Sequence, residues 1–363
     1  MFKKNKNNLI YNSIFFILIL IFIFILINKQ NGGNNNLLED NEFIVNKIFY
    51  SIKKDDVITF KELLNKYPTE IYKIKNKNNQ NIIHLICLHN SINILREIID
   101  KIDKKYLIEY DSFGNYPLKY AIIKNNIEIV NLLISKVDRE QRDKFLGFTP
   151  FLVAAFSNKL EILKILYKNG CDINSKDLRF NNNALFWAVR KYNLDIIKYL
   201  IDDLKMDYKQ RDNEGNTIFY EACSSFINDQ LKCNSTLEYL YSLDNNFINI
   251  PNNDGVYPIL IATFNYNIFP LIFIINKSKE TVFIKDNQEY NIIDYLMLTE
   301  NPENIKIIIK ILKEYYSKNE LKELLTSSFF YNLNKNINYQ KQKLNNDINY
   351  KKYINLINEE IYN

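Results

Sequence analysis

A short apolar stretch with polar ends, GFTPFLVAAFSN at residues 147–158, shows the pattern that dominates the chain. Gly147 permits a turn with positive φ, Thr149 is a favourable N-cap residue, and Pro150 then occupies the first helical position, where its missing N–H is not needed. Residues 151–156 are all apolar, so a helix formed by them has no polar face. The pattern therefore predicts a turn followed by a short helix that is buried on nearly every side.

The same pattern recurs at intervals of 33 to 40 residues. Asn replaces Gly at the start of two weaker copies, and Asn is the next most favourable residue for positive φ. A degraded copy around Tyr50 extends the series. Stacked repeats of this kind bury the helices that one repeat alone leaves exposed. The recognisable copies begin at Asn79, Gly114, Gly147, Asn181, Gly215, Gly255 and Glu289.

Repeats of this length and motif resemble the ankyrin repeat. The family pattern is Asp-x-x-Gly-x-Thr-Pro-Leu-His-x-Ala-Ala, followed by a second helix of Ile-Val-x-x-Leu-Leu type and Gly-Ala. Here one repeat contains GFTPFLVAAFSNKLEILKILYKNGCDIN and another DSFGNYPLKYAIIKNNIEIVNLLI. The resemblance implies an all-α ankyrin-repeat solenoid of about eight helix–turn–helix repeats, at residues 43–315. We expect the repeats at residues 43–75, 76–110, 111–143, 144–177, 178–211, 212–251, 252–285 and 286–315.

Two departures from the family pattern stand out. The motif histidine occurs only as His84, and its replacements elsewhere predict lost local hydrogen bonds. Repeat six is about six residues longer, through SSFINDQLKCN, which predicts either a longer first helix or a loop between its helices. After residue 315 the repeat pattern stops. We expect a capping helix that starts with a Ser317–Glu320 capping box, and then a polar tail with one last helix in YKKYINLINEEIY, within residues 316–363.

The N-terminal residues predict a membrane anchor. Residues 1–8 form a basic flank, and residues 9–27 are mostly apolar, which at helical rise gives about 28 Å, close to the thickness of a bilayer core. We therefore expect one transmembrane helix, followed by a flexible linker at residues 28–42. Lysines precede the segment and acidic residues follow it, which favours a single-pass protein whose repeats lie on the non-cytosolic side. A cleaved signal peptide is the alternative.

Composition limits the chemistry. The net charge of +5 is small for 363 residues, so we expect no nucleic-acid partner. No Cys-x-x-Cys pair occurs and there are only two histidines, so we expect no metal, no cofactor, no small-molecule substrate and no enzyme activity. The alternatives for the cysteines are a Cys223–Cys233 bridge in an oxidising compartment and small buried thiols.

The residues that face a partner are predicted from the repeat register. The resemblance implies a concave face made of the turn tips, just before each turn glycine, and the outward positions of the first helices. Aromatic residues and arginine dominate binding hot spots, although some of them could instead pack against the neighbouring repeat. The predicted partner site is Phe113, Tyr120, Phe145, Phe156, Arg179, Phe180, Trp187 and Arg190.

These observations favour a non-catalytic, membrane-tethered scaffold that binds a protein on the concave face of its repeats. The alternative is a secreted ankyrin-repeat effector, released after cleavage of the N-terminal segment. We expect the partner to be a protein.

Overall fold

The computed structural model describes residues 42–329 and 350–362. Within these residues the regular elements are helices, apart from one isolated β-bridge between Lys75 and Asn81. The chain divides into two compact units, unit 1 (Met1–Phe145) and unit 2 (Leu146–Asn363).

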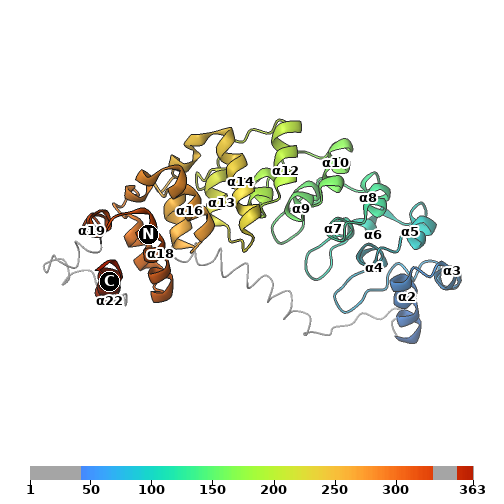
Figure 1. Ribbon diagram of the computed structural model, residues 1–363. Coiled ribbons are helices and arrows are strands. Elements are labelled where there is room, and N and C mark those ends of the chain that lie inside the picture. The colour runs from blue at the N-terminus through green and yellow to red at the C-terminus, as the bar shows by residue number, and fades with distance from the viewer. Residues whose placement is uncertain (1–41, 330–349, 363) are drawn as a thin grey trace. The chain divides into compact units, whose positions relative to one another are not determined.

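Unit 1 is built from helix pairs. In each pair the first helix packs against the second, and successive first helices pack against one another (α2 on α4, α4 on α7) (Figure 1). A short helix, α6 (Lys104–Ile108), packs beside α7. The pairs are α2 (Glu42–Lys54) with α3 (Val57–Lys66), α4 (Ile82–His89) with α5 (Ile92–Ile98), and α7 (Pro117–Ile123) with α8 (Ile127–Ile134).

Unit 2 is also built from helix pairs that follow one another in chain order (Figure 1). The first helices α9, α11, α13, α15 and α17 pack one on the next. The pairs are α9 (Pro150–Phe156) with α10 (Leu160–Lys168), α11 (Ala184–Arg190) with α12 (Leu194–Lys198), α13 (Ile218–Ser224) with α14 (Gln230–Leu243), α15 (Pro258–Phe264) with α16 (Ile268–Lys277), and α17 (Ile292–Leu298) with α18 (Pro302–Tyr315). Short 3-10 or π segments follow α12, α14 and α16 at Tyr199–Asp203, Asn245–Asn249 and Lys279–Phe283.

The predicted turn and helix start occur as the sequence indicates. Gly147 has φ 72°, and a Cβ there would lie 2.4 Å from the Leu178 side chain, so both conformation and space favour glycine. Thr149 caps α9 by accepting from the Leu152 N–H at 3.4 Å, and Pro150 occupies the first turn. The two asparagines that replace glycine in the motif have the same left-handed backbone, with φ of 58° at Asn79 and 59° at Asn181.

The short first helices are buried, as their nearly continuous apolar sequences predict. In α9 every residue from Pro150 to Ala155 is buried, and Phe151 is fully enclosed. Its neighbours within unit 2 are α10 from the same pair and α11 from the next. Stacking therefore supplies the apolar contacts that an isolated repeat lacks.

The expected loss of hydrogen bonds at the histidine position is only partly correct. His84 interacts with Asn81 Oδ1 at 2.8 Å and with the Asn115 carbonyl at 3.2 Å. At the equivalent positions, the Lys119 ammonium donates to Asp143 at 2.8 Å and the Ser328 hydroxyl donates to Asp294 at 2.5 Å. These polar replacements bond to other partners, so the position stays hydrogen-bonded in several repeats rather than in one.

Repeat six absorbs its extra residues after its first helix. The loop at residues 225–229 separates α13 from α14, and α14 is 14 residues long. The loop alternative predicted from the sequence is therefore correct, whereas α13 is no longer than the other first helices. Phe226 in the loop and Leu231 at the start of α14 remain 68% and 80% exposed.

The C-terminal end of unit 2 is covered by two further helices, α19 (Lys318–Thr326) and α22 (Tyr350–Tyr362). The predicted capping box of α19 is present, with the Ser317 N–H donating to the Glu320 carboxylate at 2.7 Å. α22 packs on α18 and α19 and buries Ile354 and Ile357. The last predicted helix therefore forms part of the folded unit.

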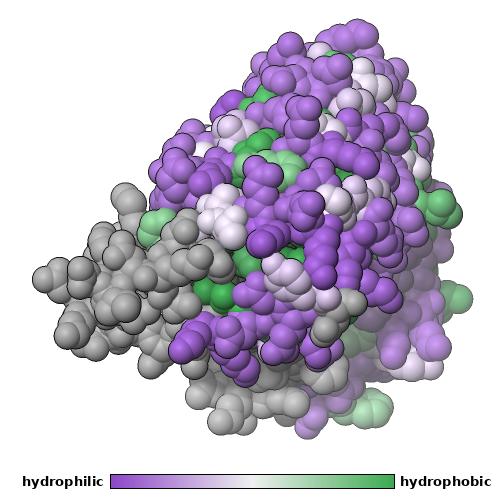
Figure 2. Space-filling view, turned by 60° about the vertical axis from the view of Figure 1, so that its left-hand side comes forward, coloured by the Kyte–Doolittle hydropathy of each residue, from purple (hydrophilic) through white to green (hydrophobic). Residues whose placement is uncertain are grey.

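The predicted transmembrane helix at residues 9–27 lies outside the described residues, as do the basic flank, most of the linker and the polar stretch at residues 332–347. In the part of the chain that the structure describes, no helix combines the length and apolar character needed to cross a bilayer. The face of the molecule seen in Figure 2 is mainly hydrophilic, and its hydrophobic residues lie in small separate groups.

Candidate protein-binding face

The predicted partner-binding residues are divided between the two units. Phe113, Tyr120 and Phe145 belong to unit 1, whereas Phe156, Arg179, Phe180, Trp187 and Arg190 belong to unit 2. In each unit they lie on turn tips or first helices, and we call this surface of a unit its inner face.

In unit 1 the predicted residues differ in exposure. The Tyr120 side chain is half-buried, and its hydroxyl donates to Asp111 at 2.5 Å and accepts from Gln80 at 3.0 Å. Burial and the Asp111 charge raise the pKa of Tyr120, so the hydroxyl stays protonated. Tyr120 thus stabilises the turn of its own repeat through Asp111. Phe145, in contrast, lies at a turn tip and is 53% exposed.

In unit 2 the expected outward position of Trp187 is wrong. Its side chain is only 1% exposed, and its ring lies 4.7 Å from that of Phe148 and 5.5 Å from that of Phe156 between centroids. The indole N–H donates to Asp177 at 3.0 Å. The other Asp177 oxygen accepts the backbone N–H groups of Arg179 and Phe180. Trp187 is buried because its helical position points at the turn of its own repeat.

The sequence carries a pattern that predicts this burial. Tyr120 bonds to Asp111, nine residues earlier, and Tyr295 bonds to Asp286 over the same spacing. Trp187 bonds to an aspartate ten residues earlier, in a turn that is one residue longer. An aromatic donor nine or ten residues after a turn aspartate is therefore a structural feature of these repeats, which the partner-site prediction missed.

Cationic side chains lie over a cluster of aromatic rings formed by Phe156, Phe180 and Trp187. The Arg190 guanidinium lies 4.6 Å from the Trp187 ring centroid and 5.5 Å from that of Phe180. Lys191 lies 4.6 Å from the Phe156 ring, and the exposed Arg179 lies 5.3 Å from the Phe180 ring. Such cation–aromatic contacts are stabilising. Within this cluster Arg179 is exposed, and the half-buried side chains are Phe156, Phe180, Arg190 and Lys191.

Arg190 also connects repeat five to repeat six through an ion pair with Glu221. Both side chains are largely removed from water, at 17% and 3% exposed. Although burial acts to lower the pKa of Arg190, the charge and hydrogen bond of Glu221 outweigh it and raise the pKa. Arg190 therefore stays positively charged beside Glu221.

Beyond this ion pair the inner face of unit 2 becomes acidic. Glu214 and Asp254 are exposed at the turn tips of repeats six and seven, and Asp212 is half-buried behind Glu214. Although the Glu214 residue as a whole is exposed, its carboxyl group is partly desolvated, and this desolvation, followed by the charges of Asp212, Glu221 and Asp254, raises the pKa of Glu214. Burial also raises the pKa of Asp212, with Glu221 contributing. Glu214 and Asp254 occupy turn tips in the repeat register but are not among the residues of the predicted partner site.

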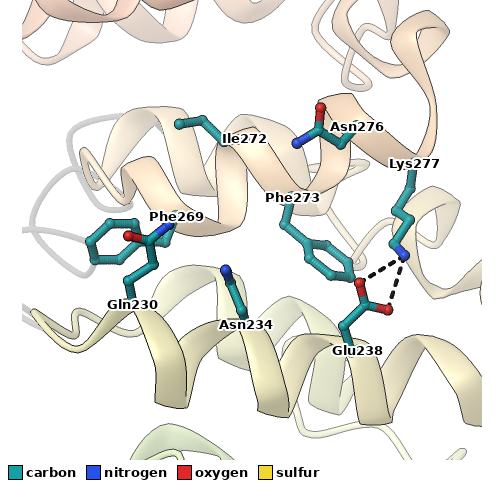
Figure 3. Close-up of a pocket in the computed structure, with 8 residues that line it drawn as sticks. All are labelled: Gln230, Asn234, Glu238, Phe269, Ile272, Phe273, Asn276 and Lys277. Atoms are coloured by element: carbon teal, nitrogen blue, oxygen red, sulfur yellow. Dashed lines mark hydrogen bonds and ion pairs between the residues drawn. The ribbon is translucent and has the colours of Figure 1, made fainter.

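A separate pocket lies between the second helices of repeats six and seven. Figure 3 shows side chains from α14 and α16 facing one another across it, with a Lys277–Glu238 ion pair of 2.8 Å at one end. The remaining lining residues are apolar or amide side chains, which offer no acid–base pair. The pocket is lined by Gln230, Asn234, Glu238, Phe269, Ile272, Phe273, Asn276 and Lys277.

The nucleophilic and metal-ligating residues do not gather into a reactive centre in the described ranges. No group of His, Cys, Asp and Glu side chains there could hold a metal ion. All four cysteines are free thiols and buried, and burial raises the pKa of Cys233 to about 11. Cys223 and Cys233 are therefore thiols in this structure, as in the second of the two alternatives.

Helix pairs joined by turns with positive-φ glycine or asparagine, stacked first helix on first helix, define a helical repeat protein. Matches to the family model for ankyrin repeats (3 copies) cover residues 48–143, 105–177 and 151–247. Together they span residues 48–247, more than half of the chain, and the chain belongs to the ankyrin-repeat family.

Known proteins with similar sequences are also ankyrin-repeat proteins. One from Acanthamoeba polyphaga mimivirus is 30% identical over 165 residues, covering 38% of this chain and 22% of the relative. A second from the same virus is 27% identical over 206 residues, covering 52% of this chain and 25% of the relative. The chain thus spans about a quarter of the length of these relatives. The solved ankyrin repeat domain of Bcl-3 matches with 16% identity and a TM-score of 0.48, covering 60% of this chain and 93% of that domain.

Proposed function

We propose that this ankyrin-repeat chain is a non-catalytic interaction module that binds a protein partner on the inner face of its repeats. The observation that carries the proposal lies in repeat five, where the exposed Arg179 contacts the half-buried Phe180, whose ring packs against the buried ring of Trp187. Exposed aromatic and arginine side chains held by a packed base are typical of binding hot spots. Membership of the ankyrin-repeat family supports a protein as the partner.

The structure changes which residues should be altered to test this proposal. Replacing Trp187 would remove a buried ring and damage the fold, so lost binding would not locate the site. The suitable variant is Phe180→Ala with Arg179→Ala, which trims the accessible edge and leaves the Trp187–Asp177 bond in place. A matched control is Tyr167→Ala with Lys168→Ala, since both residues are exposed on the second helix α10.

The experiment is affinity purification of the tagged full-length chain from the cells that express it, with quantitative comparison of the co-purified proteins. We expect a protein bound by the wild type and by the α10 control to be lost from the Phe180/Arg179 variant. An identical set of proteins on all three would contradict the assignment of this face.

For the location we propose a single-pass membrane protein, anchored through residues 9–27, with the repeats on the non-cytosolic side. The uncharged apolar run and the lysines that precede it support this proposal. The test is the size of a C-terminally tagged chain and its protease sensitivity in sealed vesicles of known orientation. Full-length size with digestion from the non-cytosolic side is expected. A shortened chain released into the medium would instead favour the secreted effector, and protection from that side would reverse the orientation.

A further inference from the structure

A pocket of about 340 Å³ lies between the first helices α2 and α4 of unit 1. The α2 residues that line it are spaced three or four apart, so they form a single stripe along the helix. The opposite side of α2 holds Ile48 and Ile52, which are fully buried in the repeat core. The helix therefore presents a second face to the pocket. The lining residues include Asn46, Phe49, Tyr50 and Lys53 from α2, and Leu85 and His89 from α4.

The apolar side chains of this pocket are partly open to solvent. Leu85 is buried, Phe49 is half-buried and Tyr50 is 61% exposed. The Lys54 ammonium lies 5.9 Å from the Tyr50 ring centroid. Ligand sites in proteins range from roughly 300 to 1,000 Å³, and this pocket lies near the lower end. Its size therefore suits a side chain of a polypeptide better than a large cofactor.

Basic side chains follow one another beside the pocket. Lys54, His89 and Lys124 occupy equivalent positions in three successive repeats, because each directly precedes the positive-φ residue that follows a first helix. Their helices α2, α4 and α7 pack one on the next (Figure 1). Together with Lys53, which lines the pocket, they form four exposed basic residues that we call the basic row. The positive-φ residues are Asp55, Asn90 and Asn125.

The basic row lacks acidic partners among residues 42–329 and 350–362. No carboxylate there lies within ion-pair distance of the row. Partial desolvation of the imidazole, followed by the charges of Lys53 and Lys124, lowers the pKa of His89. His89 is therefore close enough to both lysines to sense their charges, and an anion bound here would interact with several basic groups at once.

The carboxylate that is nearest in sequence already has other partners. Asp55 directly follows Lys54, and it accepts the Asn93 side-chain amide at 2.8 Å and the Ile94 backbone N–H at 3.0 Å. These bonds satisfy groups in the first turn of α5, where backbone N–H groups have no partner within the helix. Asp55 thus serves the start of α5, and the lysines of the row do not pair with it.

A matching ligand carries negative charge along its length and an apolar group. Carboxylates form charge-assisted hydrogen bonds with lysine and with protonated histidine, and an aliphatic or aromatic side chain fills an apolar pocket. The basic row extends over three repeats, which suits an extended polypeptide better than a small anion. A nucleic acid fits less well, because its binding relies on many phosphate contacts and the row has only four basic residues.

We propose that the α2–α4 pocket and the basic row of unit 1 bind an acidic segment of a partner polypeptide, with one apolar side chain of that segment in the pocket. The carboxylates of the segment pair with Lys53, Lys54 and Lys124, and its apolar side chain contacts Phe49 and Tyr50. This inference rests on the proposed function and specifies the chemistry of the partner at unit 1.

The experiment selects peptides from a phage-displayed library of random sequences on the full-length chain and measures the affinities of the selected peptides by fluorescence anisotropy. Lys53→Gln with Lys124→Gln removes two charges from the basic row. A matched control, Lys232→Gln with Lys322→Gln, removes two exposed charges from α14 and α19, so both variants carry the same net charge. Lys53→Arg with Lys124→Arg keeps the charges of the row, and Tyr50→Ser trims the pocket.

We expect the selected peptides to be rich in aspartate and glutamate and to contain an aliphatic or aromatic residue. The Lys53/Lys124 glutamine variant should bind them about tenfold more weakly and the control less than about twofold, and binding should weaken with salt. The arginine variant should keep the affinity, whereas Tyr50→Ser should lower it. A selection without enriched peptides, enriched peptides that are not acidic, or equal losses in the two glutamine variants would overturn the proposal.

Two other anionic probes test the choice of a polypeptide. Short single-stranded DNA and vesicles that contain phosphatidylserine are added to the complex with the selected peptide. We expect neither to displace the peptide at moderate salt. If one of them displaces it and binds with the same dependence on Lys53 and Lys124, the surface is a nucleic-acid or membrane site and the proposal is wrong.

These outcomes separate the inference from the proposed function. If no acidic peptide is selected but the Phe180/Arg179 variant still loses its protein partner, the interaction module stands and the inference about unit 1 fails. If acidic peptides bind as expected while the Phe180/Arg179 variant keeps every partner, the contact lies at the basic row and not at the aromatic edge of repeat five.

Discussion

Repeats five and six present opposite chemistry at equivalent positions beside their positive-φ residues, Asn181 and Gly215. At the turn tip, repeat five has Phe180 where repeat six has Glu214, and on the first helix Trp187 stands where repeat six has Glu221. Arg190 and Glu221 join the two across the repeat boundary. Since the turn geometry depends on glycine or asparagine and on capping residues, the tip and helix positions are free to differ between repeats. A repeat scaffold can thus change its binding chemistry within one repeat.

The largest loss of stability should come from replacing Trp187, the buried aromatic residue of repeat five. Trp187→Ala removes a fully enclosed ring and its bond to Asp177, and we expect a loss of about 3–5 kcal/mol in the free energy of unfolding. Trp187→Phe keeps a ring and should lose considerably less. Urea unfolding followed by circular dichroism checks this. A Trp187→Ala variant as stable as the wild type would mean that the ring is not part of the core.

The ion pair at the boundary should have the next largest effect. Arg190→Met leaves the Glu221 carboxylate buried beside Asp212 and Glu214 without its cation, and we expect a loss of up to about 3 kcal/mol. Adding Glu221→Gln to that variant removes the unpaired charge and should restore much of the stability. Fluorescence of Trp187, the only tryptophan, reports unfolding next to the pair. A double variant no more stable than Arg190→Met would contradict this account.

The acidic tips should give a smaller, pH-dependent effect. Because the folded pKa of Glu214 is raised above its ordinary value of 4.5, the carboxyl group favours the folded state below that value, and this contribution is lost as pH rises through the folded pKa. We therefore expect Glu214→Gln to raise the melting temperature at pH 7. The gain should vanish below about pH 4.5. Thermal melts across this range test it, with Glu62→Gln as the control. A lower melting temperature at pH 7 would reverse the sign and refute the prediction.

The smallest effect on stability is expected at the exposed tip of repeat five. Arg179→Ala should change the free energy of unfolding by less than about 0.5 kcal/mol, as is usual for exposed positions. The same substitution should reduce the free energy of partner binding by much more than it changes the free energy of unfolding. Paired measurements of stability and of partner capture on one preparation check both. A large loss of stability would place Arg179 in the structural core of the repeat.

The sequence was sufficient to predict the parts of the fold that depend on local chemistry. The turn at Gly147, the Thr149 cap and the left-handed asparagines follow from residue preferences within a few positions. The direction of Trp187 was missed because it depends on which turn an aromatic side chain packs against. The Arg190–Glu221 pair spans 31 residues in sequence, so it appears only once adjacent repeats are stacked. The packing of α22 on α18 is likewise a tertiary contact that local patterns do not encode.

The most direct test of the central claim places a photo-crosslinking amino acid at Phe180 and, separately, at Tyr167 on the second helix α10, in the full-length chain within its native cells. The account predicts a discrete crosslinked protein from position 180 that is absent from position 167. Identical products from both positions, or none from either, would contradict the claim that the inner face of these repeats binds a protein partner.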